Sequence, residues 1–284
     1  MLDFSVLEEL KDEGATDYLI RKVPLRVASL QGYESGMLIS WMTDAPEGFT
    51  ESCLTAFRRL APRLALVMNN RLLREITINV LDTYVGHQAG ERILCGEISR
   101  GSLHDIDAAI LFMDLRGFKA LSDRTDGAYM GALLNDYFER MVPPVVDRGG
   151  EILKYMGDGV LATFSLENLN DDMVCMTALN AAIEGLENVR SRNAERSAAG
   201  DPVMELDIAV HLGRVQFGNV GAGNRLDFTV IGAAVNEASR IEALCDDLGR
   251  HLVISEKFAA AATHCTGRLM SLGRHGLRGV SRDQ

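Results

Sequence analysis

Hydrophobic and polar positions divide this chain into two differently patterned halves. From residue 108 onward, short hydrophobic runs alternate with longer segments in which hydrophobic residues recur every three or four positions. Runs of the first kind predict strands, and segments of the second kind predict amphipathic helices. A polar, glycine-containing stretch at Ser99–Asp105 separates this half from the one before it. We therefore expect two parts, residues 1–99 and 100–284.

The second half predicts an α+β domain. The expected strands are Ala108–Met113, Glu151–Met156, Gly159–Phe164, Glu205–Leu212, Gln216–Val220, Phe228–Ile231 and His251–Ile254. The expected helices are Tyr129–Val142, Asp171–Arg192 and Val235–Asp247, and a surface loop is expected over Ser191–Gly200. The order strand–helix–strand–strand–helix–strand is typical of a ferredoxin-like (βαββαβ) sheet covered by helices.

The first half predicts a smaller α+β segment and one long helix. The expected elements are a helix at Ser5–Lys11, strands at Val23–Leu30 and Met37–Met42, and a hairpin turn at Gln31–Gly36. The long helix has Thr50 as its N-cap and an apolar stripe from Leu54 to Val80. Pro62 interrupts this stripe and should kink or split the helix.

Two interpretations of the long helix stay open. It covers the small sheet of its own chain, or it pairs with a second subunit as a parallel coiled coil. A small sheet followed by a long helix resembles part of a GAF-like sensory domain. This resemblance implies a regulatory or sensory role for residues 1–99, and the sequence does not identify the signal that they would receive.

Composition and charge limit the classes of partner and the cellular location that we expect for this protein. A net charge of −11 argues against binding to nucleic acid. No apolar run approaches the roughly 18 residues of a membrane span, and the acidic N-terminus is unlike a signal peptide. The 5 cysteines form no C-x-x-C motif, and the 6 histidines lack zinc-site spacing. We expect a cytoplasmic protein with reduced thiols and no membrane partner.

Two acidic residues each lie at the end of an expected hydrophobic strand and close to a glycine. Asp114 follows the run Ala109–Met113, and Gly117 comes shortly after it. Asp158 lies between two glycines, in the expected turn between two strands. Either residue alone is most simply a turn or cap former. Together, two carboxylates at strand ends beside glycines suit divalent cations and phosphate groups.

A third motif lies on an expected helix. Asn236 and Arg240 are one helical turn apart, so their side chains project from the same face. An isolated N-x-x-x-R is most simply a solvated polar face. Here the pair follows Ile231 and Gly232, within the stretch FTVIGAAVNEASR at residues 228–240.

Residues 110–118 (ILFMDLRGF), 151–159 (EILKYMGDG) and 228–240 together resemble the class III nucleotidyl cyclases, which convert ATP or GTP into a 3′,5′-cyclic nucleotide. The resemblance covers about residues 108–278. It implies a class III cyclase domain over residues 100–284 that uses two Mg²⁺ ions per site, with Mn²⁺ as an alternative. The implied metal ligands are Asp114, Asp158 and the backbone carbonyl of Leu115.

The same resemblance assigns the substrate contacts. The backbone of Arg116, Gly117 and Phe118 would bind the phosphates. Asn236 would orient the ribose, and Arg240 would neutralise the charge that grows on the α-phosphate, a task that suits a forked, permanently charged donor.

Lys154 and Thr229 resemble the base-reading pair of the subclass IIIb adenylate cyclases. A lysine donates to the unprotonated N1 of adenine, and a hydroxyl accepts from its N6 amino group. Guanylate-specific members place Glu, and usually Cys, at these two positions. The Lys/Thr pair therefore favours ATP as the substrate. Several members of this subclass respond to bicarbonate, so a bicarbonate or other small-molecule regulator stays open.

In the family, one domain supplies the metal carboxylates and the other supplies the base-reading and transition-state residues. This chain carries both sets, which implies a head-to-tail homodimer with two symmetric sites. Two alternatives remain: a catalytically weak, nucleotide-sensing module with the same fold, and a guanylate or mixed cyclase. A diguanylate cyclase is disfavoured because no GG[DE]EF motif is present.

The chain departs from the family pattern near its end. The family usually continues into another strand there, so a truncated chain is one expectation. Val280 stands where we align the lysine of a basic phosphate contact, and Arg278 or Arg282 could serve instead.

Overall fold

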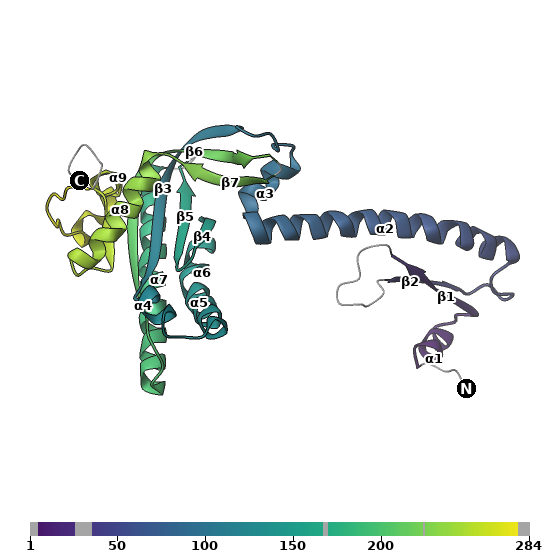
Figure 1. Ribbon diagram of the computed structural model, residues 1–284. Helices are drawn as coiled ribbons and strands as arrows, with labels where there is room; N and C mark the ends of the chain where they lie inside the picture. The colour runs from purple at the N-terminus through teal and green to yellow at the C-terminus, as the bar shows by residue number, and fades with distance from the viewer. Residues whose placement is uncertain (1–4, 26–35, 167–169, 224, 278–284) are drawn as a thin grey trace. The chain divides into compact units, whose positions relative to one another are not determined.

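The computed structural model describes residues 5–25, 36–166, 170–223 and 225–277 (Figure 1). By its internal contacts the chain separates into two compact units, residues 1–80 and 81–284. The predicted boundary between a regulatory segment and a catalytic domain at residue 100 stays a prediction, as does the GAF-like nature of the first segment.

The first unit contains a two-stranded sheet and most of a long helix. Its elements are α1 (Ser5–Asp12), β1 (Asp17–Pro24), β2 (Gly36–Thr43) and α2 (Glu51–Val85). The two strands pair antiparallel, from Asp17 opposite Thr43 to Pro24 opposite Gly36. The predicted first strand was thus placed too late in the chain, because β1 already begins at Asp17. The predicted hairpin turn lies outside the described residues, apart from Gly36.

Helix α2 packs on this small sheet through its first turns. The ring of Phe57 stacks on Trp41 of β2 with 4.6 Å between the ring centroids, and Ala61 and Ala65 are buried. The Thr50 hydroxyl accepts a hydrogen bond from the backbone N–H of Cys53, which confirms the predicted N-cap. Pro62 lies inside the helix without splitting it, contrary to one of our two expectations.

The second unit is a six-stranded sheet with β3 at its centre, between β5 and β6. Its strands are β3 (Leu103–Arg116), β4 (Glu151–Met156), β5 (Gly159–Ser165), β6 (Glu205–Ala222), β7 (Arg225–Ile231) and β8 (Leu252–Ile254). They run in the order β4-β5-β3-β6-β7 with antiparallel pairing, and β8 lies parallel beside β6. The two strands predicted at residues 205–220 are one continuous strand, because β6 pairs along the whole of β3.

Helices cover both faces of this sheet. They are α3 (His87–Leu94), α4 (Phe118–Ser122), α5 (Gly127–Met141), α6 (Pro143–Val146), α7 (Asp171–Ala199), α8 (Ala233–Asp247) and α9 (Glu256–Ala261), followed by a short 3₁₀ turn at Thr263–Arg268. Successive side chains of β3 point to opposite faces of the sheet. Leu111 and Met113 pack with α5 and α7, whereas Ala108 and Ile110 pack with α8. The arrangement confirms the predicted α+β, ferredoxin-like fold.

The loop predicted at Ser191–Gly200 is wrong. Helix α7 continues to Ala199 and ends at Gly200, whose φ of 78° is left-handed. The polar residues that suggested a loop bind their neighbours: the guanidinium groups of Arg192 and Arg196 both donate to the carboxylate of Asp136 on α5. These ion pairs, rather than an apolar stripe, hold the last turns of the helix.

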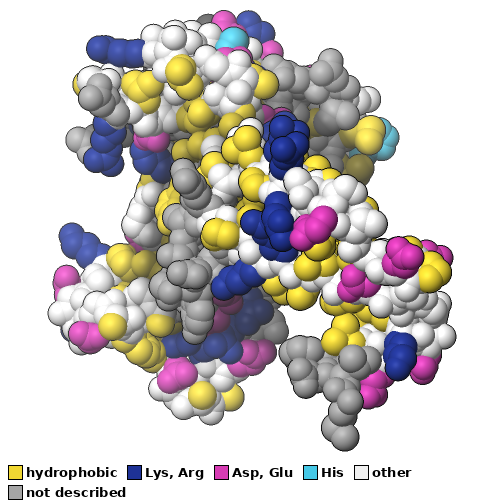
Figure 2. Space-filling view, turned by 90° about the vertical axis from the view of Figure 1, so that its right-hand side faces the viewer, with side chains coloured by type: hydrophobic (Ala, Val, Ile, Leu, Met, Phe, Trp, Pro, Cys, Tyr) yellow, Lys and Arg dark blue, Asp and Glu magenta, His cyan; other side chains and the backbone are white. Residues whose placement is uncertain are grey.

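Hydrophobic and charged side chains alternate over the face shown in Figure 2. Among the described residues, no helix combines the length and the apolar character that crossing a membrane requires.

Candidate active site

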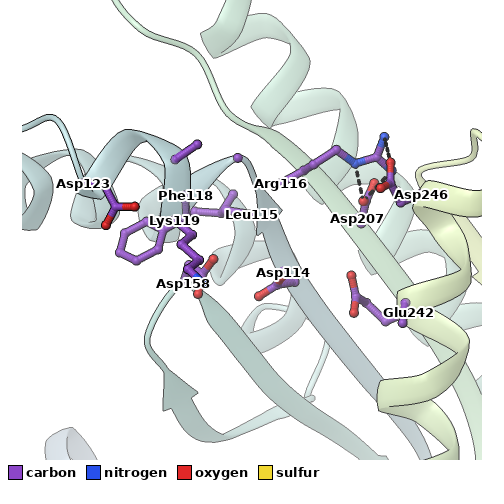
Figure 3. Close-up of a pocket in the computed structure, with 13 residues that line it drawn as sticks. Asp114, Leu115, Arg116, Phe118, Lys119, Asp123, Asp158, Asp207, Glu242 and Asp246 are labelled. Carbon is purple, nitrogen blue, oxygen red and sulfur yellow. Dashed lines mark hydrogen bonds and ion pairs between the residues drawn. The ribbon is translucent and has the colours of Figure 1, made fainter.

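A cavity of about 550 Å³ lies at the end of β3 (Figure 3). The described carboxylates that line it are Asp114, Asp123, Asp158, Asp207, Glu242 and Asp246. The cations that line it are Arg116 and Lys119, and Leu115, Gly117 and Phe118 also line it. We call this cavity the acidic pocket. All the sequence-predicted metal and phosphate positions fall within it.

The strands explain why the two predicted metal aspartates meet. Asp114 lies in β3, and Asp158 lies in the tight turn between β4 and β5, where Gly157 has a φ of 72°. A Cβ atom at Gly159 would lie only 3.0 Å from Oδ1 of Asp114. The glycine that follows Asp158 therefore allows the turn to approach Asp114 closely.

Burial and mutual repulsion perturb the carboxyl groups of the pocket. Burial, followed by the charges of Asp158 and Asp207, raises the pKa of Asp114 to about 6. Burial also raises the pKa of Glu242 to about 7, with Asp114 as the largest charge contribution. Repulsion between carboxylates in a partly buried pocket is relieved when a cation binds between them.

The donor set fits Mg²⁺ or Mn²⁺. Across the described ranges, no three His, Cys, Asp or Glu side chains are arranged to hold a metal ion by themselves. Mg²⁺ in nucleotide enzymes is commonly bound by one or two carboxylates, while the substrate phosphates and water supply the other ligands. Asp114 and Asp158 match that smaller requirement, and Leu115 also lines the pocket.

The two cations of the pocket differ in their partners. Nη2 of Arg116 lies 2.6 Å from Oδ2 of Asp207, and its Nη1 lies 3.2 Å from Oδ1 of Asp246 (Figure 3). Lys119 forms no ion pair with any residue that the structure describes. At Gly117 the backbone is left-handed, with a φ of 89°, as it enters α4. The side chain of Arg116 is thus held by ion pairs with Asp207 and Asp246.

The remaining predicted residues lie outside the acidic pocket of their own chain. Asn236 and Arg240 lie on the face of α8 opposite its buried stripe, which consists of Ala234, Ala238, Ile241 and Cys245. Neither of the two makes a hydrogen bond or ion pair within the described part of the chain. Lys154 is on β4 and Thr229 is on β7, and neither lines the pocket.

The structure also reveals polar residues that the sequence motifs did not indicate. Asp207 and Glu242 enter the acidic pocket from β6 and α8. The carboxylate of Asp227 accepts a hydrogen bond from Nζ of Lys154. Nε2 of His211, which is fully buried, lies 3.2 Å from Oε2 of Glu237. The sequence signals for Glu242 and Asp227 were their short spacings from Arg240 and Thr229.

The chain is similar in sequence to known proteins. A family model described as the adenylate and guanylate cyclase catalytic domain matches residues 104–282. An adenylate cyclase of Anabaena cylindrica is 39% identical over 151 residues, which are 52% of this chain and 29% of that protein. The chain therefore corresponds to less than a third of the length of that relative.

Two solved structures show the same fold. The adenylyl cyclase CyaB from P. aeruginosa superimposes with a TM-score of 0.57 at 25% identity, over 64% of this chain and 92% of that one. The guanylyl cyclase Cya2 superimposes with a TM-score of 0.55 at 28% identity, over 65% of this chain and 91% of that one. The neighbours thus include cyclases of both base specificities.

Proposed function

Because this chain belongs to the family of adenylate and guanylate cyclase catalytic domains, we propose that it is an adenylate cyclase acting in intracellular signal transduction. It converts ATP into 3′,5′-cyclic AMP and pyrophosphate. The ribose 3′-oxygen attacks the α-phosphorus, the bond from that phosphorus to the pyrophosphate oxygen breaks, and the 3′-hydroxyl proton is lost. The observation that carries the proposal is the acidic pocket around Asp114 and Asp158.

In this proposal, Asp114, Asp158 and the carbonyl oxygen of Leu115 hold two Mg²⁺ ions, with Mn²⁺ as an alternative. When bound, the ions lower the pKa of the 3′-hydroxyl and neutralise charge on the triphosphate. The backbone of Arg116, Gly117 and Phe118 binds the phosphates. The ion pairs from Arg116 to Asp207 and Asp246 keep that backbone segment in place.

The second set of residues handles the base and the transition state. Lys154 donates to N1 of adenine, and Thr229 accepts from its N6 amino group. Asn236 orients the ribose. Arg240 neutralises the charge that develops on the α-phosphate, since its guanidinium is charged at every relevant pH and is not engaged by any described residue of its own chain.

These two sets meet across a homodimer interface. Asn236, Arg240, Lys154 and Thr229 do not line the acidic pocket of their own chain. We therefore assign them to the pocket of a second copy, in a head-to-tail dimer with two symmetric sites. Paired α2 helices and a bicarbonate or other small-molecule regulator remain predictions for the control of this dimer.

A guanylate cyclase is the second candidate, because the chain is 28% identical to the guanylyl cyclase Cya2 over the superimposed region. Lys154 argues for ATP. Guanine carries a hydrogen on N1, and an ammonium can only donate, so the two would repel one another.

Cyclic-nucleotide formation from ATP and GTP tests these assignments together. The reaction is measured with Mg²⁺ or Mn²⁺ for the full chain, Asp158→Ala, Lys154→Ala and an equal mixture of the two variants. We expect cyclic AMP from the full chain and almost none from either variant. The mixture should recover about a quarter of the original activity, because half of the dimers are mixed and each has one intact site.

Each different outcome would contradict a different part of the proposal. Failure of the mixture to recover activity would rule out the shared site. Cyclic GMP as the main product would make the chain a guanylate cyclase. A folded dimer that binds ATP but forms no product would be the nucleotide-sensing module.

A further inference from the structure

Lys154 has an ion-pair partner within its own chain. Its Nζ lies 2.5 Å from Oδ2 of Asp227. The two side chains are 46% and 56% exposed. Ion pairs with this much contact with solvent contribute little to the stability of a fold. We therefore connect the contact with a role of Lys154 in ligand binding rather than with stabilisation of the sheet.

The strand geometry places this pair beside Thr229. A shift in pairing register between Ile152 and Lys154 marks a bulge in β4, and bulges redirect the side chains next to them. On β7, Asp227 and Thr229 are two residues apart, so their side chains lie on one face, whereas Phe228 is buried on the other. Lys154, Asp227 and Thr229 form one polar group, which we call the base-reading cluster.

No side chain stands directly across the strand pair from Thr229. Its partner in β6 is Gly218, where a Cβ atom would lie only 1.9 Å from the backbone oxygen of Ser102. A larger residue therefore cannot replace this glycine without moving the backbone.

The chemistry of the cluster explains why Lys154 needs a fixed position. The hydroxyl of Thr229 can donate or accept, so by itself it does not distinguish the amino group of adenine from the carbonyl of guanine. An ammonium only donates, but it sits on a long, flexible stem. A carboxylate that accepts one ammonium hydrogen orients the other two. An ammonium held in this way favours the N1 acceptor of adenine over the N1–H of guanine.

We infer that Asp227 is a specificity-determining positioning residue, which holds the ammonium of Lys154 toward the nucleobase and so favours ATP over GTP. The inference rests on the proposed cyclase function and adds a residue to its base-reading site. Asp227 acts through Lys154 and makes no contact with the reacting atoms.

The test compares kcat and KM for ATP and for GTP in the full chain. Asp227→Ala should lower the ATP-to-GTP ratio of kcat/KM about tenfold, the order expected for loss of one charge-assisted hydrogen bond. Most of the change should appear as a higher KM for ATP, because base contacts are already made in the ground state. Asp227→Glu, which keeps the charge, should retain part of the preference.

Two further variants distinguish the positioning of Lys154 by Asp227 from a general loss of structure. Lys154→Ala should have almost no activity, so in that background calorimetric dissociation constants for ATP and GTP replace the kinetic ratio. There, Asp227→Ala should change the ratio of these constants by less than about a further twofold, because the residue acts through the lysine. Asp107→Ala is the matched control. Its carboxylate lies 2.8 Å from Arg214 in an ion pair of 49% and 69% exposure on the same sheet, and its loss should leave the ratio unchanged.

An unchanged ratio in Asp227→Ala would overturn the inference, as would an equally large loss in the Lys154→Ala background. If the full chain forms no cyclic nucleotide, the proposed function fails but the inference can still be tested. Calorimetric dissociation constants for ATP and GTP then replace the kinetic ratio, with the same variants and the same expected order.

Discussion

The acidic pocket and the base-reading cluster differ in how strongly each is built into the fold. Asp114 and Glu242 are partly buried, and burial, with a further contribution from neighbouring carboxylates, raises the pKa of both groups. Lys154 and Asp227 are about half exposed, and their loss should cost the fold little. Variants in the first region should therefore change both stability and activity, and variants in the second should change activity alone.

The largest effect should come from Arg240 on α8. Arg240→Ala should lower kcat about 10²–10³-fold, because a positioned cation no longer meets the charge of the transition state. The melting temperature should stay the same, since Arg240 has no ion-pair or hydrogen-bond partner in the described chain. Arg240→Lys, which keeps the charge but loses the fork, should be intermediate.

Initial rates and thermal unfolding of the same samples check this prediction. The control is Arg250→Ala, which removes an exposed arginine just beyond the end of α8 and should leave the rate unchanged. A fall in melting temperature that parallels the fall in rate would show that Arg240 supports the fold rather than the reaction.

A smaller effect, on stability, should come from metal binding in the acidic pocket. Millimolar Mg²⁺ should raise the melting temperature at pH 8, by about 2–4 °C for each kcal/mol of binding free energy in a unit of this size. Folding raises the pKa of Asp114 from 3.8 to about 6. Stability of the metal-free protein therefore falls as pH rises between these values, and metal restores it above them.

At pH 5.5, Asp114 is mostly protonated, so the increase in melting temperature should be smaller. Asp158→Ala should abolish the increase at pH 8. Asp123→Asn changes another carboxylate that lines the same pocket and should keep most of it. An equal response in these two variants would mean that the metal binds to the general negative charge rather than to Asp114 and Asp158.

The sequence alone predicted only some of the residues that form the acidic pocket and the base-reading cluster. The alternation and the glycines placed Asp158 correctly in the turn between β4 and β5, because such turns depend on local residues. Asp207 was not anticipated because its position depends on the long-range pairing of Asp207 with Asp114. Asp227 was missed because its contact with Lys154 depends on the approach of two strands that are far apart in the sheet order.

Helix ends and strand breaks were the least predictable features of the fold. The end of α7 lacks an apolar stripe and is held by ion pairs to Asp136, so its composition resembled that of a loop. The break predicted within β6 follows local glycine and polar residues, whereas β3 supplies continuous pairing through that region. In both cases tertiary contacts outweighed the local pattern.

The smallest predicted effect concerns His211, a buried residue of β6 that lies beside Glu237 of α8. Burial is the main reason that its pKa is lowered from 6.5 to about 4, against the opposing influence of Glu237. As pH falls from 6.5 to 4, the unfolded chain gains a proton that the folded chain does not, so stability decreases through this window and is fully present above it. The decrease should amount to about 1–3 kcal/mol.

His211→Gln removes this titration, and its melting temperature should fall less steeply than that of the original chain between pH 6.5 and 4. His251→Gln serves as the control, because that histidine is partly exposed and lies 2.8 Å from Asp207 instead. Equal slopes for the original chain and His211→Gln would show that other groups govern acid unfolding. Since α8 carries Arg240 as well as Glu242, loosening it by charging His211 would disturb the proposed transition-state contact and the acidic pocket at once, whereas Asp227→Ala should disturb only the base-reading cluster.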